Sequence, residues 1–145
     1  MDVDGTLTDG RIYIGAQGEV MKAFDVKDGY AIIHLREKGI EPVIITGRSS
    51  AIVQERAREL KITELYQCVS DKQQQLKAVA EKFGCTPDEI AYIGDDENDM
   101  TCIEYCGVTG CPHDAIAMVR NAVSYVCEKD GGRGAVREFI EWFLG

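Results

Sequence analysis

Short runs rich in Val and Ile alternate along the chain with longer amphipathic stretches. This pattern is typical of parallel strands joined by crossover helices. We predict strands at 1–4, 41–46, 65–69, 90–94, 107–110 and 124–126. We predict helices at 28–38, 49–60, 71–83, 97–105, 115–120 and 134–143, with a capped single turn at 86–89. The predicted fold class is α/β, a Rossmann-like three-layer arrangement around a parallel sheet.

The segment 11–25 departs from this alternation. It is predicted to form a β-hairpin with its turn at Gly15-Ala16-Gln17-Gly18. An isolated two-stranded ribbon cannot bury much apolar surface on its own. The apolar residues of this ribbon are Tyr13, Ile14, Val20, Met21 and Phe24. We therefore favour a subunit contact for the hairpin over a flap that only covers a site.

Length and composition predict a single domain spanning 1–145, because 145 residues with 45% hydrophobic and 28% charged residues form an ordinary globular chain. No apolar stretch is long enough to span a bilayer, and no basic-then-apolar leader precedes the first motif. A cytoplasmic location without membrane contact is the expectation. The formal net charge of -9 argues against nucleic acid as a partner.

The six cysteines include no C-x-x-C pair, and without a leader they are expected to be free thiols. A zinc site is a weaker alternative, because the spacing of Cys102, Cys106, Cys111 and His113 matches no standard ligand pattern.

Three polar clusters follow predicted strands: Asp2-Val3-Asp4-Gly5-Thr6, Thr46-Gly47-Arg48 and Gly94-Asp95-Asp96-Glu97-Asn98-Asp99. The carboxyl ends of parallel strands share one edge of a sheet, where open α/β folds place their ligands. Converging carboxylates repel one another unless a cation lies between them, and oxygen ligands imply Mg²⁺. The sequence therefore predicts a magnesium site at this edge.

Asp2 and Asp4 are two residues apart on a predicted strand, so both side chains point to the same face. One carboxylate can attack a phosphoryl group and form an aspartyl phosphate while the other handles protons. The moving phosphoryl group also needs electrostatic support. Thr46 and Lys72, at the start of its predicted helix, are the candidates for that support.

Asp-x-Asp-Gly-Thr, Thr-Gly-Arg, a lone Lys and Gly-Asp-Asp-x-Asn-Asp, in this order, resemble the four motifs of haloacid dehalogenase phosphatases. The resemblance implies that Asp2 is the nucleophile and Asp4 the general acid and base. It implies that Thr46 and Lys72 bind phosphate, and that Asp2, the Asp4 carbonyl and Asp95 bind Mg²⁺. Asp96 and Asp99 are expected behind them, orienting Lys72 or metal-bound water.

Further segments are similar to the 3-deoxy-D-manno-octulosonate (KDO) 8-phosphate phosphatase group of that family, including Phe-Asp-Val-Lys-Asp-Gly-Tyr and the Gly-rich stretch 131–138. The group lacks a cap domain, and no inserted domain is apparent here. The resemblance implies a sugar-acid phosphate as substrate and a homotetramer with shared active sites. Members of the family have several apolar residues before the nucleophile, whereas here only Met1 precedes Asp2. We expect an unusually short first strand, unless the start is truncated or misassigned.

A carboxylate on the substrate calls for cations beyond the catalytic set. Arg48, beside Gly47, together with Lys27 and Arg133, are the candidates for substrate binding. Each has a plain structural alternative: a salt bridge for Arg48, a solvated loop for Lys27 and a helix start for the stretch around Arg133.

Three other functions remain open. A nine-carbon keto acid 9-phosphate (KDN or sialic acid type) would need nearly the same motifs. A non-catalytic oligomerisation module, related to domains fused to cytidylyltransferases, is opposed by the four intact motifs. A signalling receiver domain also combines acids, Thr, Lys and Mg²⁺, but its acceptor Asp lies on a middle strand, separate from the first acidic pair.

Overall fold

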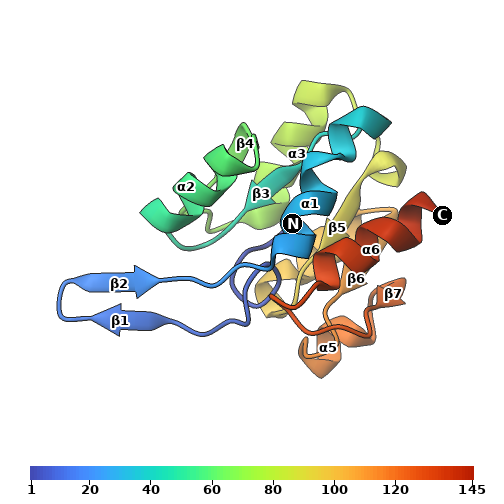
Figure 1. Ribbon diagram of the computed structural model, residues 1–145. Coiled ribbons are helices and arrows are strands. Elements are labelled where there is room, and N and C mark those ends of the chain that lie inside the picture. Colours follow the sequence, from blue (N-terminus) through green and yellow to red (C-terminus); the bar gives the residue numbers. More distant parts are fainter.

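The computed structural model describes residues 1–145 and confirms the α/β class (Figure 1). Five predicted strands are present with slightly different bounds: β3 Val43–Ile45, β4 Glu64–Tyr66, β5 Ala91–Ile93, β6 Val108–Cys111 and β7 Tyr125–Val126. β3 and β4 pair in parallel, and β5, β6 and β7 form a second parallel set in that order.

The prediction of a strand at 1–4 is wrong, because no strand forms there. Met1 nevertheless joins the two parallel sets. Its amino group donates to the Val43 carbonyl at 2.9 Å, and its carbonyl accepts from Ile45 N–H at 3.1 Å. On the other side, Asp2 N–H donates to the Ile93 carbonyl at 3.1 Å. The chain then turns at Val3, whose carbonyl accepts from Thr6, Leu7 and Thr8, so only two residues are extended.

Beside Met1, an apolar cavity of about 460 Å³ separates β3 from β5. Its walls include Val43, Ile45, Ile90, Val136 and Phe139. The buried position of Met1 also lowers the pKa of the α-amino group, because desolvation outweighs the attraction of Asp2.

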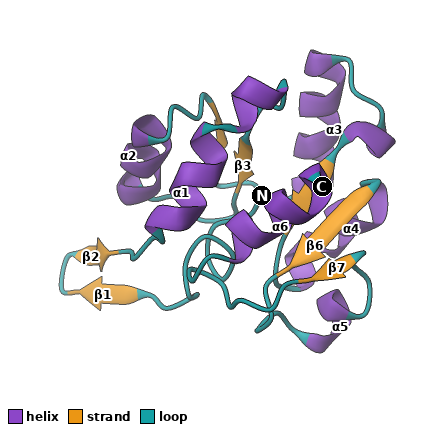
Figure 2. Ribbon diagram, turned by 45° about the vertical axis from the view of Figure 1, so that its right-hand side comes forward, coloured by secondary structure: helices purple, strands orange, loops and turns teal.

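Two layers of helices sandwich the strands (Figure 2). Helices α1 (Val26–Ile33), α2 (Ala51–Glu59) and α6 (Ala135–Leu144) pack against Ile44 and Ile93 in one core cluster. Helices α3 (Lys72–Phe83), α4 (Met100–Tyr105) and α5 (Ala117–Arg120) pack against Ile45 and Tyr92 in the other. Neighbouring strand residues thus face opposite layers, as the two-residue period of a strand requires. None of the helices combines the length and apolarity that crossing a membrane requires.

Local signals explain most helix ends. The Asp71 side chain accepts from Gln74 N–H at 2.9 Å and starts α3, while Gly84 ends it in the left-handed region. The helix predicted at 28–38 is two elements, because α1 ends at Ile33 and a 3₁₀ turn, η1 (Leu35–Lys38), follows. Short 3₁₀ turns also occupy Pro87–Glu89 (η2), where the predicted capped turn is a capping box of Thr86 and Glu89, and Glu97–Asp99 (η3).

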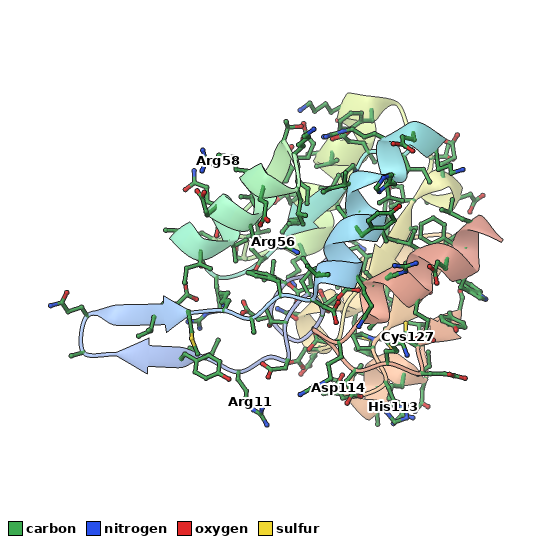
Figure 3. All side chains as sticks on the ribbon, viewed as in Figure 1. Arg11, Arg56, Arg58, His113, Asp114 and Cys127 are labelled. Atoms are coloured by element: carbon green, nitrogen blue, oxygen red, sulfur yellow. The ribbon has the colours of Figure 1, made fainter.

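The predicted hairpin is confirmed as β1 (Tyr13–Gly15) and β2 (Gly18–Met21), which project from the body of the molecule in Figure 1. Ile14 is 72% exposed and Val20 61% exposed. The base of the hairpin is held by α2. Arg56, labelled in Figure 3, lies 5.4 Å from the centre of the Phe24 ring.

Candidate active site

The first and third polar clusters converge at the carboxyl end of the sheet. Lys72, the first residue of α3, reaches across to both of them: its Nζ donates to Asp2 Oδ1 and to Asp99 Oδ1, each at 2.8 Å. All three residues are buried, with exposures of 5% or less. Burial lowers the pKa of Lys72, but the charges of Asp2 and Asp99 outweigh it and hold that pKa above its ordinary value. The lysine is therefore a fixed positive charge beside Asp2.

Asp99 is fully engaged by the protein. Besides Lys72, its Oδ1 accepts from the Tyr92 hydroxyl at 2.6 Å. Its Oδ2 accepts from the backbone N–H groups of Asp95 at 2.9 Å and Asp96 at 3.3 Å. Asp99 thus contacts the loop that carries Asp95 and, through Lys72, is linked to Asp2. The orienting role of Asp99 stays a prediction.

Asp95 lies against the first motif. Its Oδ1 accepts from the Thr6 hydroxyl at 2.8 Å. A Cβ on Gly5, whose φ is +96°, would lie 2.0 Å from Asp95 Oδ2. The glycine of the Asp-x-Asp-Gly motif is therefore needed both for its backbone conformation and for this close approach.

Burial and mutual repulsion raise the pKa values of the acids at this edge. Burial, followed by the neighbouring charges of Asp2 and Asp99, raises the pKa of Asp95 to about 8, although the Thr6 hydrogen bond opposes the change. Burial and the charge of Asp99 likewise raise the pKa of Asp2, more than Lys72 lowers it. One lysine does not compensate three carboxylates.

These residues fit a magnesium ion. Carboxylate oxygens of Asp2, Asp95 and Asp99 lie within 4.8 Å of one another. Each carboxylate oxygen of Asp99 already accepts two hydrogen bonds from the protein. Asp2 and Asp95 are therefore the carboxylates that would hold the ion. The Asp4 carbonyl accepts no backbone hydrogen bond, which leaves it available as a third oxygen ligand. Hard oxygen donors of this kind suit Mg²⁺.

The C-terminal Gly-rich stretch packs against the first motif. Gly132 N–H donates to the Thr6 carbonyl at 3.1 Å, and a Cβ on Gly131 would lie 1.9 Å from the Gly5 carbonyl oxygen. Gly131 N–H donates at 2.9 Å to Asp114, which is labelled in Figure 3. The glycines allow the two backbones to touch, so this tail supports the loop between Asp4 and Thr8.

The second cluster flanks the same edge. Thr46 is 2% exposed, and its backbone is held by Tyr66 and Val69 through hydrogen bonds of 2.9 and 3.1 Å. Gly47 and Arg48, directly after it, are exposed. The phosphate-binding role of Thr46 stays a prediction.

The other candidate residues are dispersed around this edge. The side chain of Lys27 is 58% exposed, and its Nζ lies 3.6 Å from Asp25 Oδ2. Its Cε is 3.6 Å from the place of a Cβ on Gly134, next to the exposed Arg133. The Asp96 side chain accepts from Glu97 N–H at 2.7 Å and caps η3. It forms no hydrogen bond or ion pair with Lys72. The substrate-binding roles stay predictions.

Sequence reasoning missed three contributors. Tyr92 anchors Asp99, Thr6 anchors Asp95, and Lys22 of the hairpin forms an ion pair with Asp4. The motif itself contains Thr6, so its position in the sequence was a usable signal. Tyr92 and Lys22 had none, because their partners are defined only by the fold.

The cysteines are all free. Burial raises the pKa of the Cys102 thiol to about 11 and that of Cys106 to about 12. Such thiols are poor ligands and poor nucleophiles. The aspartate trio is the only cluster of potential metal ligands in the chain, and Cys102, Cys106, Cys111 and His113 do not form one.

Fold and site together define a hydrolase with a buried aspartate, a lysine and an acidic metal site. A family model of haloacid dehalogenase-like hydrolases matches residues 19–107. The chain is also 43% identical, over 99% of its length and 76% of the relative, to the Yersinia pestis protein named 3-deoxy-D-manno-octulosonate 8-phosphate phosphatase KdsC. The chain therefore belongs to the haloacid dehalogenase-like hydrolases, as the motif order predicted.

Solved structures agree closely with this fold. The Moraxella catarrhalis 3-deoxy-D-manno-octulosonate 8-phosphate phosphatase, in complex with magnesium, phosphate and KDO, superposes with a TM-score of 0.95 at 41% identity. The match covers 99% of this chain and 83% of that one. The cobalt-bound deoxy-D-mannose-octulosonate 8-phosphate phosphatase from Haemophilus influenzae also gives a TM-score of 0.95, at 36% identity over 99% of this chain and 84% of that one.

Proposed function

We propose that this protein is a Mg²⁺-dependent phosphatase that hydrolyses 3-deoxy-D-manno-octulosonate 8-phosphate to KDO and phosphate. The observation that carries the proposal is the buried Asp2 held by Lys72 beside Asp95. The names of relatives that match nearly the whole chain give the substrate. The chain itself has no cap domain between its motifs.

In the proposed reaction, an Asp2 oxygen attacks phosphorus and forms an aspartyl phosphate, while the bond from phosphorus to the sugar oxygen breaks. Asp4 gives its proton to the departing sugar oxygen. Water then attacks phosphorus and gives a proton to Asp4, and the bond between Asp2 and phosphorus breaks. Lys72 and Thr46 hold the phosphoryl oxygens, and a bound Mg²⁺ supplies positive charge for them.

The cations outside this set are assigned to the substrate carboxylate. Arg48, Lys27 and Arg133 are exposed, and Gly47 directly precedes Arg48. An arginine fork suits a carboxylate. Loss of Arg48 should therefore impair the octulosonate phosphate far more than p-nitrophenyl phosphate, which has no carboxylate.

We also assign the chain to a homotetramer in which a neighbour's hairpin and tail help to enclose each site. The exposed Ile14 and Val20 support this assignment, because apolar surface of this kind marks an interface. A cytoplasmic location is supported by six free thiols, since oxidising compartments favour disulfides.

The test is phosphate release, with Mg²⁺ and after chelation, across KDO 8-phosphate, nine-carbon keto acid 9-phosphates and hexose phosphates. The proposal expects a metal-dependent preference for the eight-carbon acid. A preference for a nine-carbon acid would keep the mechanism and replace the substrate. No release from any of them by folded protein would favour a non-catalytic oligomerisation module.

Asp2→Asn is the matched control for this test. It keeps the shape of the side chain but removes the nucleophile, so turnover should fall by at least about a thousandfold. Circular dichroism should show an intact fold. Substantial remaining activity would exclude Asp2 as the nucleophile.

A further inference from the structure

Lys22 links the hairpin to the site. It follows β2 directly, and its side chain is 1% exposed, although the hairpin around it is open to solvent. Its Nζ forms an ion pair with Asp4 Oδ1 and a second one with Glu19 Oε1, the latter at 2.9 Å. Lys22 is also the only side-chain partner recorded for Asp4. A buried lysine with two acidic partners is held in one geometry far more firmly than a surface lysine.

Glu19 connects this pair to the second motif. Its Oε2 accepts from the Ser50 hydroxyl, and Ser50 caps α2 through Val53 N–H at 3.2 Å. Ser50 N–H donates to the Gln67 side chain at 2.8 Å. Partial burial of Glu19 would raise its pKa, but hydrogen bonds from Ser50 and Lys22 outweigh it and hold that pKa below its ordinary value. The chain of contacts Ser50–Glu19–Lys22–Asp4 therefore runs from the start of α2 to the first motif.

From this geometry we propose that Lys22 is a positioning residue for Asp4. The Lys22 ammonium binds Asp4 Oδ1 and leaves Asp4 Oδ2 to exchange the proton with the leaving oxygen. The inference rests on the proposed function, in which Asp4 is the general acid and base. Asp4 lies in an irregular turn after the two extended residues, so its side chain gains little orientation from the backbone. As the proton leaves Asp4, the charge that develops on its carboxylate faces the Lys22 ammonium. The hairpin would then contribute to catalysis within its own chain.

Leaving groups of different acidity isolate this role. A series of substituted phenyl phosphates keeps the substrate shape nearly constant while the need for proton donation rises from p-nitrophenyl to phenyl phosphate. In Lys22→Met, kcat/KM should fall by at least about tenfold for phenyl phosphate but less than about threefold for p-nitrophenyl phosphate. Because kcat/KM covers only the steps up to loss of the leaving group, the later attack of water does not mask the difference.

Three variants accompany Lys22→Met. Lys22→Arg keeps a cation and should restore most of the activity on phenyl phosphate. Glu19→Gln breaks the far support without emptying the buried space, so it should show the same selective loss even if Lys22→Met folds poorly. Lys38→Met, at an exposed position of η1, removes the same charge far from the site and should change neither substrate.

The outcomes separate the two proposals. Equal losses on all leaving groups, or none in both Lys22→Met and Glu19→Gln, would overturn the positioning role while wild-type turnover upholds the phosphatase. If wild-type protein released no phosphate from any ester, the proposed function would fail, and the role of Lys22 with it.

Discussion

Asp28 is a buried carboxylate that the proposed chemistry does not use. It is 1% exposed, and its Oδ1 accepts from Arg137 N–H at 2.8 Å, at the start of α6. Its Oδ2 has no hydrogen-bond partner. Burial raises the pKa of Asp28 from 3.8 to about 6, although the backbone hydrogen bond from Arg137 opposes the change. Asp28 thus links α1 to α6 through a hydrogen bond, while burial makes its charged form unfavourable.

This shift predicts a pH dependence of stability. The folded chain holds the Asp28 proton more tightly than the unfolded chain, so the free energy of unfolding falls as pH rises from about 4 to about 6 and stays lower above that. At about 1.4 kcal/mol per pKa unit, the loss is on the order of 3 kcal/mol. In Asp28→Asn this part of the slope should disappear.

Urea unfolding at closely spaced pH values measures the slopes. Glu104→Gln, which removes one charge from an exposed position of α4, is the control and should keep the wild-type slope. Identical slopes in Asp28→Asn and wild type would contradict the assignment.

The sequence predicted the residues whose chemistry is concentrated in short motifs. Asp2, Asp95, Asp99 and Lys72 meet because their segments all reach the carboxyl edge of the sheet, where the motif order predicted that they would converge. Partners that come together only in the tertiary structure could not be predicted from the sequence. Asp28 contacts a residue 109 positions away, and no local pattern specifies that pairing.

At the scale of elements, the first strand is where prediction and structure differ most. The pattern of 1–4 is that of a buried strand, but only Met1 and Asp2 form backbone hydrogen bonds to β3 and β5 before the chain turns at Val3. The amphipathic helices and the hairpin were predictable because their periodicity and turn residues are local. The break between α1 and η1 was not, because the apolar spacing continues through it.

At the scale of the whole molecule, the hairpin predicts assembly. Ile14→Glu combined with Val20→Glu changes two side chains that are 72% and 61% exposed, so the fold of one chain should survive. Light scattering after gel filtration should show a tetramer for the wild type and a smaller species for the double variant. Met118→Glu, at a site on α5 that is 52% exposed, should leave the mass unchanged. A wild-type monomer would contradict the assignment.

The acidic balance of the molecule predicts how Mg²⁺ affects stability. The net charge is -9, and Asp2 and Asp95 are held close together without full compensation. An ion that binds only the folded state stabilises it by about 2.7 kcal/mol at a hundred times its Kd. Millimolar Mg²⁺ should therefore raise the unfolding temperature by several degrees, measured against NaCl of equal ionic strength so that general screening is matched.

Asp95→Asn distinguishes a specific site from the general acidity of the chain. Without Mg²⁺ this variant should unfold at a higher temperature than the wild type, because the carboxylate whose pKa is raised to about 8 is replaced by a neutral amide. Its response to Mg²⁺ should be nearly lost, whereas Glu97→Gln, an exposed neighbour, should respond as the wild type does. If Asp95→Asn kept the full response, Mg²⁺ would be acting on the charge of the whole surface and not on the aspartates at the sheet edge.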